Sequence, residues 1–170
     1  RGTQCHNTPM IAGEEINRFI HPENLWFLNE DAIPRVEWWF DSKQICSFRG
    51  SHSGYLRLTP PVRPVREIIL DKVHSCLVVR DSFAPQDTEH DVVTTLQMAR
   101  GVKVEKSVNG QLLLVSGGQR FSLVFQEMDS WEIESFDSPV SPSYGVIEAA
   151  TAVCWKSIDG CRSSLTMCIV

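Results

Sequence analysis

Short apolar segments recur along the chain at intervals of roughly ten residues. They are rich in Val, Ile, Leu, Phe and Trp, and they are separated by Gly, Pro, Asn, Asp or Ser. This pattern is typical of an antiparallel all-β domain. The clearest predicted strands are Val36–Phe40, Tyr55–Leu58, Val65–Leu70, Cys76–Val79, Val92–Met98, Leu112–Val115, Phe121–Phe125 and Trp131–Phe136.

Alternation and turn residues support the same interpretation. Side chains two residues apart share one face of a strand, so Phe121, Leu123 and Phe125 are predicted to point inward together. Asn109-Gly110 is the dipeptide best suited to a tight hairpin, here between 102–108 and 112–115, and Gly117-Gly118 predicts a second hairpin.

The prolines and the missing helical pattern complete the fold prediction. Prolines fall between the predicted strands, where the missing N–H interrupts no ladder, at Pro60, Pro61, Pro64, Pro85, Pro139 and Pro142. No long window keeps an apolar stripe at helical spacing free of Pro and Gly. We therefore predict a single domain over residues 1–170, a β-sandwich of two stacked antiparallel sheets with about ten to twelve short strands.

Charge and composition exclude several classes of protein. The chain carries 16 basic and 21 acidic side chains, and its arginines are scattered among acids, whereas nucleic-acid binders present a clustered basic face. We expect no nucleic-acid partner. No stretch approaches the roughly 18 apolar residues of a membrane-spanning helix, so no membrane span is predicted. The chain opens on Arg1 without a signal pattern, and we expect it to be part of a longer protein.

Six cysteines contain no Cys-x-x-Cys pair, which argues against a zinc ribbon or a thioredoxin-type site. Several of them lie within apolar segments, so the pattern favours small buried side chains over a disulfide framework. The cysteines are Cys5, Cys46, Cys76, Cys154, Cys161 and Cys168.

Local motifs for catalysis are absent from the sequence. The five histidines form no His-x-His or His-Glu-x-x-His pair, so spacing alone favours surface or structural roles for them. No Gly-x-Ser-x-Gly elbow or phosphate-binding glycine loop is present, and nothing in the spacing of the acids selects a catalytic pair.

Two histidines still stand in informative contexts. His6 precedes a Pro-Met-Ile segment that is predicted to begin a strand, and its imidazole could complete a metal site or act as a base with partners from elsewhere. His52 precedes Gly54 and Tyr55, and we favour an imidazole that caps a turn while Tyr55 packs. Arg57 and Arg66 could pair with acids such as Asp81 or Glu67, or contact a carboxylate of a substrate, and surface pairing is the usual case.

Several segments, taken in order, resemble one known family. Residues 1–8 read Arg-Gly-Thr-Gln-Cys-His-Asn-Thr, similar to an Arg-Ser-Thr-x-x-His-Asn-Thr motif. The other matching pieces are 13–19, His52–Leu58, Pro61-Val62, Arg66, Val78–Asp81 and Ser141–Gly145. Together they resemble the heparinase II/III-like polysaccharide lyases, in the β-sandwich that follows the α-helical toroid.

The resemblance implies a function for the parent protein. Such enzymes cleave uronic-acid polysaccharides by β-elimination, with a Tyr and a His or Asn of the helical domain transferring protons, so an upstream helical toroid and an acidic polysaccharide are the expected partners. His6 corresponds to one ligand of the family's zinc site, whose other ligands would precede Arg1. His52, Tyr55 and Arg57 are the candidate substrate-binding residues.

This chain also departs from the family pattern. Gln97 stands where relatives tend to carry a His, and the usual paired basic residues are reduced to Arg63 and Arg66 with Pro64 between them. These changes leave the substrate class open.

We therefore expect the C-terminal sandwich of a lyase that acts on an acidic polysaccharide, inactive when isolated, in a periplasmic or secreted setting. The alternative is a non-catalytic carbohydrate-binding or structural sandwich domain.

Overall fold

The computed structural model describes residues 2–21, 23–106, 111–126 and 128–170. Within these ranges it contains fourteen strands and three short 3-10 helices, η1 (Thr3–Cys5), η2 (Met128–Ser130) and η3 (Gly160–Arg162). The longest apolar stretches form strands, and no described helix is long and apolar enough to span a bilayer. The all-β class predicted from the sequence is confirmed.

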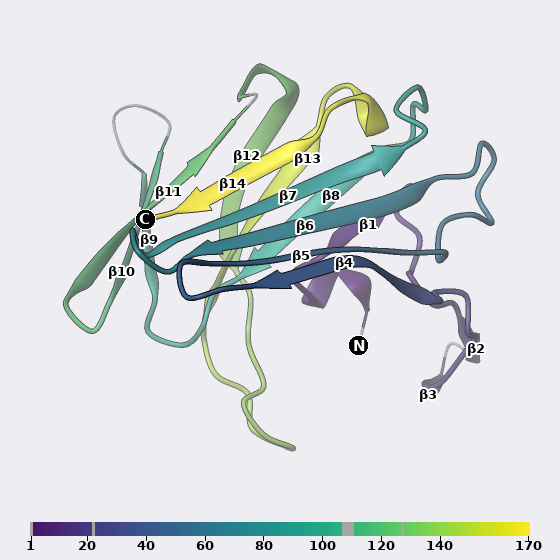
Figure 1. The fold of residues 1–170 in the computed structure, drawn as a ribbon. Coiled ribbons are helices and arrows are strands. Elements are labelled where there is room, and N and C mark those ends of the chain that lie inside the picture. The colour runs from purple at the N-terminus through teal and green to yellow at the C-terminus, as the bar shows by residue number, and fades with distance from the viewer. Residues whose placement is uncertain (1, 22, 107–110, 127) are drawn as a thin grey trace.

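Two antiparallel sheets stack on each other, as Figure 1 shows with the larger sheet in front. The four-stranded sheet has the order β1-β8-β13-β12, formed by β1 (Pro9–Ile11), β8 (Val92–Gln97), β13 (Thr151–Ser157) and β12 (Trp131–Asp137). A separate ribbon pairs β2 (Phe19–His21) with β3 (Asn24–Leu28). The eight-stranded sheet has the order β4-β5-β6-β7-β14-β11-β10-β9, formed by β4 (Pro34–Asp41), β5 (Ile45–His52), β6 (Arg63–Asp71), β7 (Cys76–Ala84), β14 (Leu165–Ile169), β11 (Gln119–Phe125), β10 (Leu112–Ser116) and β9 (Lys103–Lys106).

The core lies between the two sheets and follows the alternation of the strands. Trp155 of β13 is fully buried and packs edge-on against Phe125 of β11, with 6.2 Å between the ring centroids. Leu123 and Phe125 point inward as predicted. Phe121 is 41% exposed, contrary to the prediction, because it lies close to the turn that joins β10 and β11.

Most of the predicted strands and one of the two hairpins are confirmed. Gly117 and Gly118 form the turn between β10 and β11, with φ of +55° and +80°, which favours glycine. The hairpin predicted at Asn109-Gly110 falls outside the described residues, although β9 and β10 on either side of it pair antiparallel.

Two local predictions are wrong. Tyr55–Leu58 is a series of turns, in which Leu56 N–H donates to the carbonyl of Ser53 at 2.9 Å. The alternation of four residues was too short to distinguish a strand from a turn that buries the Tyr55 ring. Pro64 lies inside β6, opposite Phe83. It is the second residue of β6, close to the start of the strand.

The four-stranded sheet does not extend over the whole of its partner. Its last element on one side is β1, and the carbonyl of Asn7, just before β1, accepts a hydrogen bond from Arg66 of β6. β5 and β4 lie further out, and all eight residues of β4 are exposed. The sequence predicted a strand at Val36–Phe40 but not that both of its faces would meet solvent.

Candidate functional site

The turn that carries His6 is anchored by Thr3. The backbone N–H and the hydroxyl of Thr3 both donate to Oε2 of Glu15, at 2.6 and 2.7 Å, and the hydroxyl accepts from Ile16 N–H at 2.9 Å. A Cβ on Gly2 would lie 3.0 Å from the same carboxylate. These contacts fix η1 and leave His6 exposed at its end.

Asn7 joins the two sheets directly below this turn. Its side-chain Oδ1 accepts a hydrogen bond from the backbone N–H of Gln97 in β8 at 2.7 Å, and its carbonyl accepts one from Arg66. Arg66 also forms a two-point ion pair with Asp81 of β7, at 2.6 and 2.7 Å. Asp81 is only 1% exposed, so its charge depends on Arg66 as a partner.

His6, the residue that the resemblance assigns to a zinc site, belongs to no group of potential metal ligands among the described residues. Among the residues that the structure describes, no three His, Cys, Asp or Glu side chains are grouped as a metal site requires. The residues of this chain therefore do not by themselves fit a zinc centre. A fixed turn that presents one exposed imidazole fits a single ligand of a site completed by other residues.

His52 caps the turn that follows β5, as the sequence predicts. Its Nδ1 accepts a hydrogen bond from Gly54 N–H at 3.1 Å, and its ring centroid lies 5.8 Å from that of Tyr55. Burial lowers the pKa of His52, with a further contribution from the cations Arg63 and Arg66. The imidazole is therefore neutral at pH 7, with Nε2–H free to donate.

Gly54 is required at this turn for a steric reason. A Cβ at this position would lie 2.8 Å from the carbonyl of Ile16 and 3.0 Å from Nδ1 of His52. The close approach holds the turn against the segment 14–16, which also carries the anchor of Thr3.

Tyr55 and Arg57 lie beneath the His52 turn and face inward. Tyr55 is fully buried, its hydroxyl donates to the carbonyl of Glu14 at 3.1 Å, and burial raises its pKa to about 12. Arg57 donates to the carbonyls of Glu15 and Gly54 and lies 3.5 Å from the Glu14 carboxylate. Both side chains thus support the turn, and their predicted contact with substrate stays a prediction.

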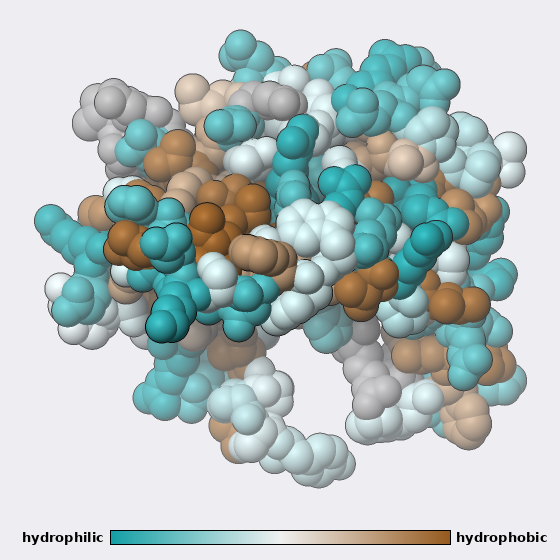
Figure 2. All heavy atoms as spheres, in the orientation of Figure 1, coloured by the Kyte–Doolittle hydropathy of each residue, from teal (hydrophilic) through white to brown (hydrophobic). Residues whose placement is uncertain are grey.

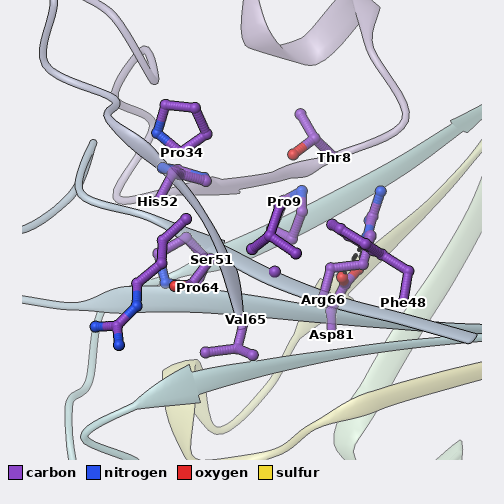
Figure 3. A pocket seen from close by; sticks show the side chains of 13 residues that line it. Thr8, Pro9, Pro34, Phe48, Ser51, His52, Pro64, Val65, Arg66 and Asp81 are labelled. Carbon is purple, nitrogen blue, oxygen red and sulfur yellow. Dashed lines mark hydrogen bonds and ion pairs between the residues drawn. The ribbon is translucent and has the colours of Figure 1, made fainter. Parts of the chain in front are cut away.

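A cavity of about 230 Å³ connects the two motifs. Its walls come from Thr8 and Pro9 on one element, Phe48 and His52 on β5, and Arg66 on β6. Figure 3 shows Phe48, Arg66 and Asp81 on one side of it and His52 with Pro34 on the other. The structure thus brings His52 and Thr8, the last residue of the His-Asn-Thr segment, to one cavity, whereas His6, Tyr55 and Arg57 do not line it.

Phe48 and Gly50 are among the residues of this cavity that sequence reasoning missed. A Cβ on Gly50 would lie 2.5 Å from the Phe48 ring, so a larger residue there would displace it. A glycine inside a strand indicates a close approach of this kind, but β5 was not among the strands predicted from the sequence, so this signal was not available for Gly50. Arg66 pairs with Asp81, one of the two acids expected for it.

The comparison with known families gives a decisive result. The sequence profile described as "Heparinase II/III-like, C-terminal" matches residues 1–160. This chain belongs to that family. The resemblance carried by residues 1–8, 52–58 and 141–145 is therefore confirmed for the heparinase II/III-like chain.

Solved structures share the fold of this heparinase II/III-like domain. It aligns with the heparan sulfate lyase HepC from Pedobacter heparinus at a TM-score of 0.75 and 10% identity, and with a heparinase III, the BT4657 gene product, at 0.72 and 13%. Each alignment covers 99% of this chain but only 24% of the other. No curated protein matches it in sequence.

The heparinase II/III-like domain exposes large apolar side chains around β4. Trp39 is 65% exposed although it packs against Phe48, and Val36 lies on the same face of the sheet. Trp26 and Phe27 on the β2–β3 ribbon are also exposed. Figure 2 shows brown hydrophobic residues among hydrophilic ones on the outer side of the larger sheet and a hollow between two projections below it.

The two projections are continuous with the sheets. One is the β2–β3 ribbon, and the other is the loop 138–150 between β12 and β13, both extending below the sheets in Figure 1. Tyr144 near the end of the loop is 97% exposed. Large exposed apolar patches are typical of interaction surfaces.

Proposed function

We propose that this chain is the C-terminal β-sandwich of a polysaccharide lyase that cleaves a uronic-acid-containing polysaccharide by β-elimination. The family match over residues 1–160 carries the proposal. It is supported by the shared fold with proteins described as a heparan sulfate lyase and as heparinase III.

Neither tyrosine of this chain is placed for the proton transfers that this reaction needs. A base must remove the proton next to the uronate carboxylate, the bond from C4 to the glycosidic oxygen must break, and that oxygen must receive a proton. Tyr55 is buried with its pKa raised to about 12, and Tyr144 stands on a projecting loop away from the cavity. These are the two tyrosines of the chain. The proton-transfer residues are therefore proposed to come from a helical domain upstream, and the isolated chain to be inactive.

The surface around β4 is the proposed contact with that helical domain. The fold neighbours are about four times as long as this chain, since it covers 24% of each. Trp39, Val36 and Trp26 are exposed in the chain alone and would lose that exposure in a complete protein. The apolar character of this side suits a permanent contact within one polypeptide better than a reversible one.

His52 is the proposed contact with the substrate. A neutral imidazole with Nδ1 engaged by Gly54 can donate from Nε2–H to a carboxylate oxygen of the polymer. Tyr55 and Arg57 are proposed to act through His52, because their polar atoms hold its turn. His6 is proposed as one zinc ligand, with the remaining ligands supplied from upstream.

One set of proteins tests the proposal. The full-length protein and the chain 1–170 are each incubated with alginate, heparan sulfate and hyaluronan, and the ultraviolet absorbance of the unsaturated uronate is followed. We expect product from the full-length protein alone. His52→Gln should lower kcat/KM about 10–100-fold, the range for a lost hydrogen bond to a charged group, and the exposed His74→Gln should not.

The same proteins report on the metal. Zinc content of the full-length protein should fall in His6→Ala and stay unchanged in His21→Ala, since His21 is an exposed residue of the β2–β3 ribbon. β-Elimination catalysed by the isolated chain would overturn the proposal that the proton-transfer residues lie in an upstream domain. Sugar binding without any absorbance change by the full-length protein would favour the non-catalytic alternative.

A further inference from the structure

Two cysteines from distant parts of the sequence meet on the eight-stranded sheet. Cys76 is the first residue of β7, and Cys168 lies in β14, the neighbouring strand. The register pairs Cys168 with Val78, so Cys76 and Cys168 are diagonal neighbours on one face. Their Sγ atoms are 3.0 Å apart, about 1 Å longer than a disulfide bond.

The pair lies on the outer face of this sheet. Leu77 and Met167, the neighbours of the two cysteines in sequence, line the space between the sheets. Because side chains alternate along a strand, Cys76 and Cys168 point the opposite way. Both are only partly buried, so a small oxidant can reach them.

We propose that Cys76 and Cys168 form a disulfide that locks β14 to β7. The oxidant is a small-molecule disulfide such as oxidised glutathione. One cysteine thiolate attacks it, forming a mixed disulfide and releasing one glutathione thiolate. The second cysteine thiolate then attacks the protein-bound sulfur and displaces the second glutathione. Two thiol protons pass to the two glutathione thiolates, so two cysteines are oxidised and one disulfide is reduced.

The proposed disulfide would join two neighbouring strands at the centre of the eight-stranded sheet. β14 is the strand through which the half-sheet β4-β5-β6-β7 continues into the half-sheet β11-β10-β9. A covalent bond there closes a loop that spans 92 residues of sequence. Long loops of this kind restrict the unfolded chain strongly, so the disulfide should stabilise the sheet at its junction.

The two buried cysteines differ from this pair. Cys154 and Cys161 are buried, and burial raises the pKa of each thiol, so they fit the role of small core side chains.

Burial, together with Cys76, also raises the pKa of Cys168, to about 11. Disulfide exchange at the pair should therefore accelerate as the pH rises above neutral.

Peptide mapping of the full-length protein tests this proposal directly. Trypsin cuts after Lys72 and Arg80 and after Arg162, so Cys76 leaves in peptide 73–80 and Cys168 in a peptide that begins at Ser163. Cys76 is the one cysteine of the first peptide, and Cys168 is the one cysteine between Ser163 and Val170. After equilibration with oxidised glutathione and alkylation of free thiols, we expect most of peptide 73–80 to be recovered cross-linked to the Ser163 peptide. Dithiothreitol should abolish the link.

Matched variants complete the test. Cys168→Ser should abolish the cross-link, whereas Cys46→Ser, a partly buried cysteine of β5, should retain it. Oxidation should raise the melting temperature of the Cys46→Ser protein by roughly 5–15 °C. Recovery of peptide 73–80 from the wild type only in alkylated or glutathione-bound form would overturn the proposal, and that result needs no variant to fold. The mapping does not depend on lyase activity, so it can fail independently of the proposed function.

Discussion

Two regions of the eight-stranded sheet, its centre around β14 and β11 and its edge at β4, are built from similar residues but lie in opposite surroundings. Around β14 and β11 the inner face packs against the four-stranded sheet, and Trp155 on that sheet is completely buried. At β4 a run of three aromatic residues, Trp38, Trp39 and Phe40, is exposed on both faces of the strand. Hydrophobic sequence alone therefore predicts a strand but does not say what covers it. The contrast indicates that the core around β14 is complete, whereas the β4 edge lacks a covering layer within the described residues.

The largest expected effect compares the two tryptophans. Trp155→Ala should lower the free energy of unfolding of the 170-residue chain by about 3–5 kcal/mol, because it leaves a cavity between the sheets. Trp39→Ala should cost about 0.5 kcal/mol or less in the same chain, since its ring is mostly in water. Urea denaturation followed by circular dichroism measures both.

The same substitution in the full-length protein sharpens the comparison. There Trp39→Ala should cost more than in the isolated chain, because the proposed helical domain covers the ring. An equal, small cost in both proteins would show that β4 faces solvent in the complete molecule.

A smaller effect separates buried from exposed charge pairs. Asp81→Ala leaves the Arg66 guanidinium, which is three-quarters buried, without its carboxylate, and should cost about 2–4 kcal/mol. Glu148→Ala breaks the pair with the mostly exposed Arg100 and should cost about 1 kcal/mol at most. Denaturation midpoints of the two variants provide the measurement. Equal costs would mean that the cavity beside Arg66 is more hydrated than its contacts indicate.

The smallest effect concerns the base of the β2–β3 ribbon. Side-chain hydrogen bonds from Arg18 lower the pKa of Asp31 to about 2. Since the pKa in the folded state lies below the unfolded value, the pair stabilises the fold above about pH 4, and this contribution is lost as the pH falls through 2.

An NMR titration of the Asp31 carboxyl checks this expectation. Arg18→Gln should return the pKa toward the ordinary value of 3.8, and Arg162→Gln, whose partner is Glu89, should leave it unchanged. A normal pKa for Asp31 in the wild type would mean that Arg18 does not hold the ribbon at its base.

Local patterns were enough to predict most strands. Alternation predicted β11, and two adjacent glycines predicted the hairpin that joins it to β10. Both features are determined by residues that are neighbours in sequence. Tyr55–Leu58 was wrongly predicted as a strand because the position of Tyr55 depends on residues far away in sequence. Its hydroxyl donates to the carbonyls of Pro9 and Glu14. The exposure of β4 could not be predicted, since it depends on where the other sheet ends.

In the candidate site, too, local contacts could be predicted from the sequence and long-range contacts could not. The capping role of His52 depends on Gly54, two residues further along the chain, and the sequence predicted it. The anchoring of His6 through Thr3 and Glu15 depends on a contact across 12 residues. The meeting of Cys76 and Cys168 depends on the register of β7 with β14, and neither strand alone encodes it. Contacts of this kind are set by tertiary pairing and leave no periodic mark in the sequence.

The place of β14 also bears on how the protein is made. Of the described strands it is the last to leave the ribosome, yet it belongs in the middle of the larger sheet. During synthesis β7 and β11 each wait with an unpaired edge until residues 165–169 emerge. That interval is when the nascent chain is most open to pairing with another copy of itself, and a chaperone would protect it most effectively then.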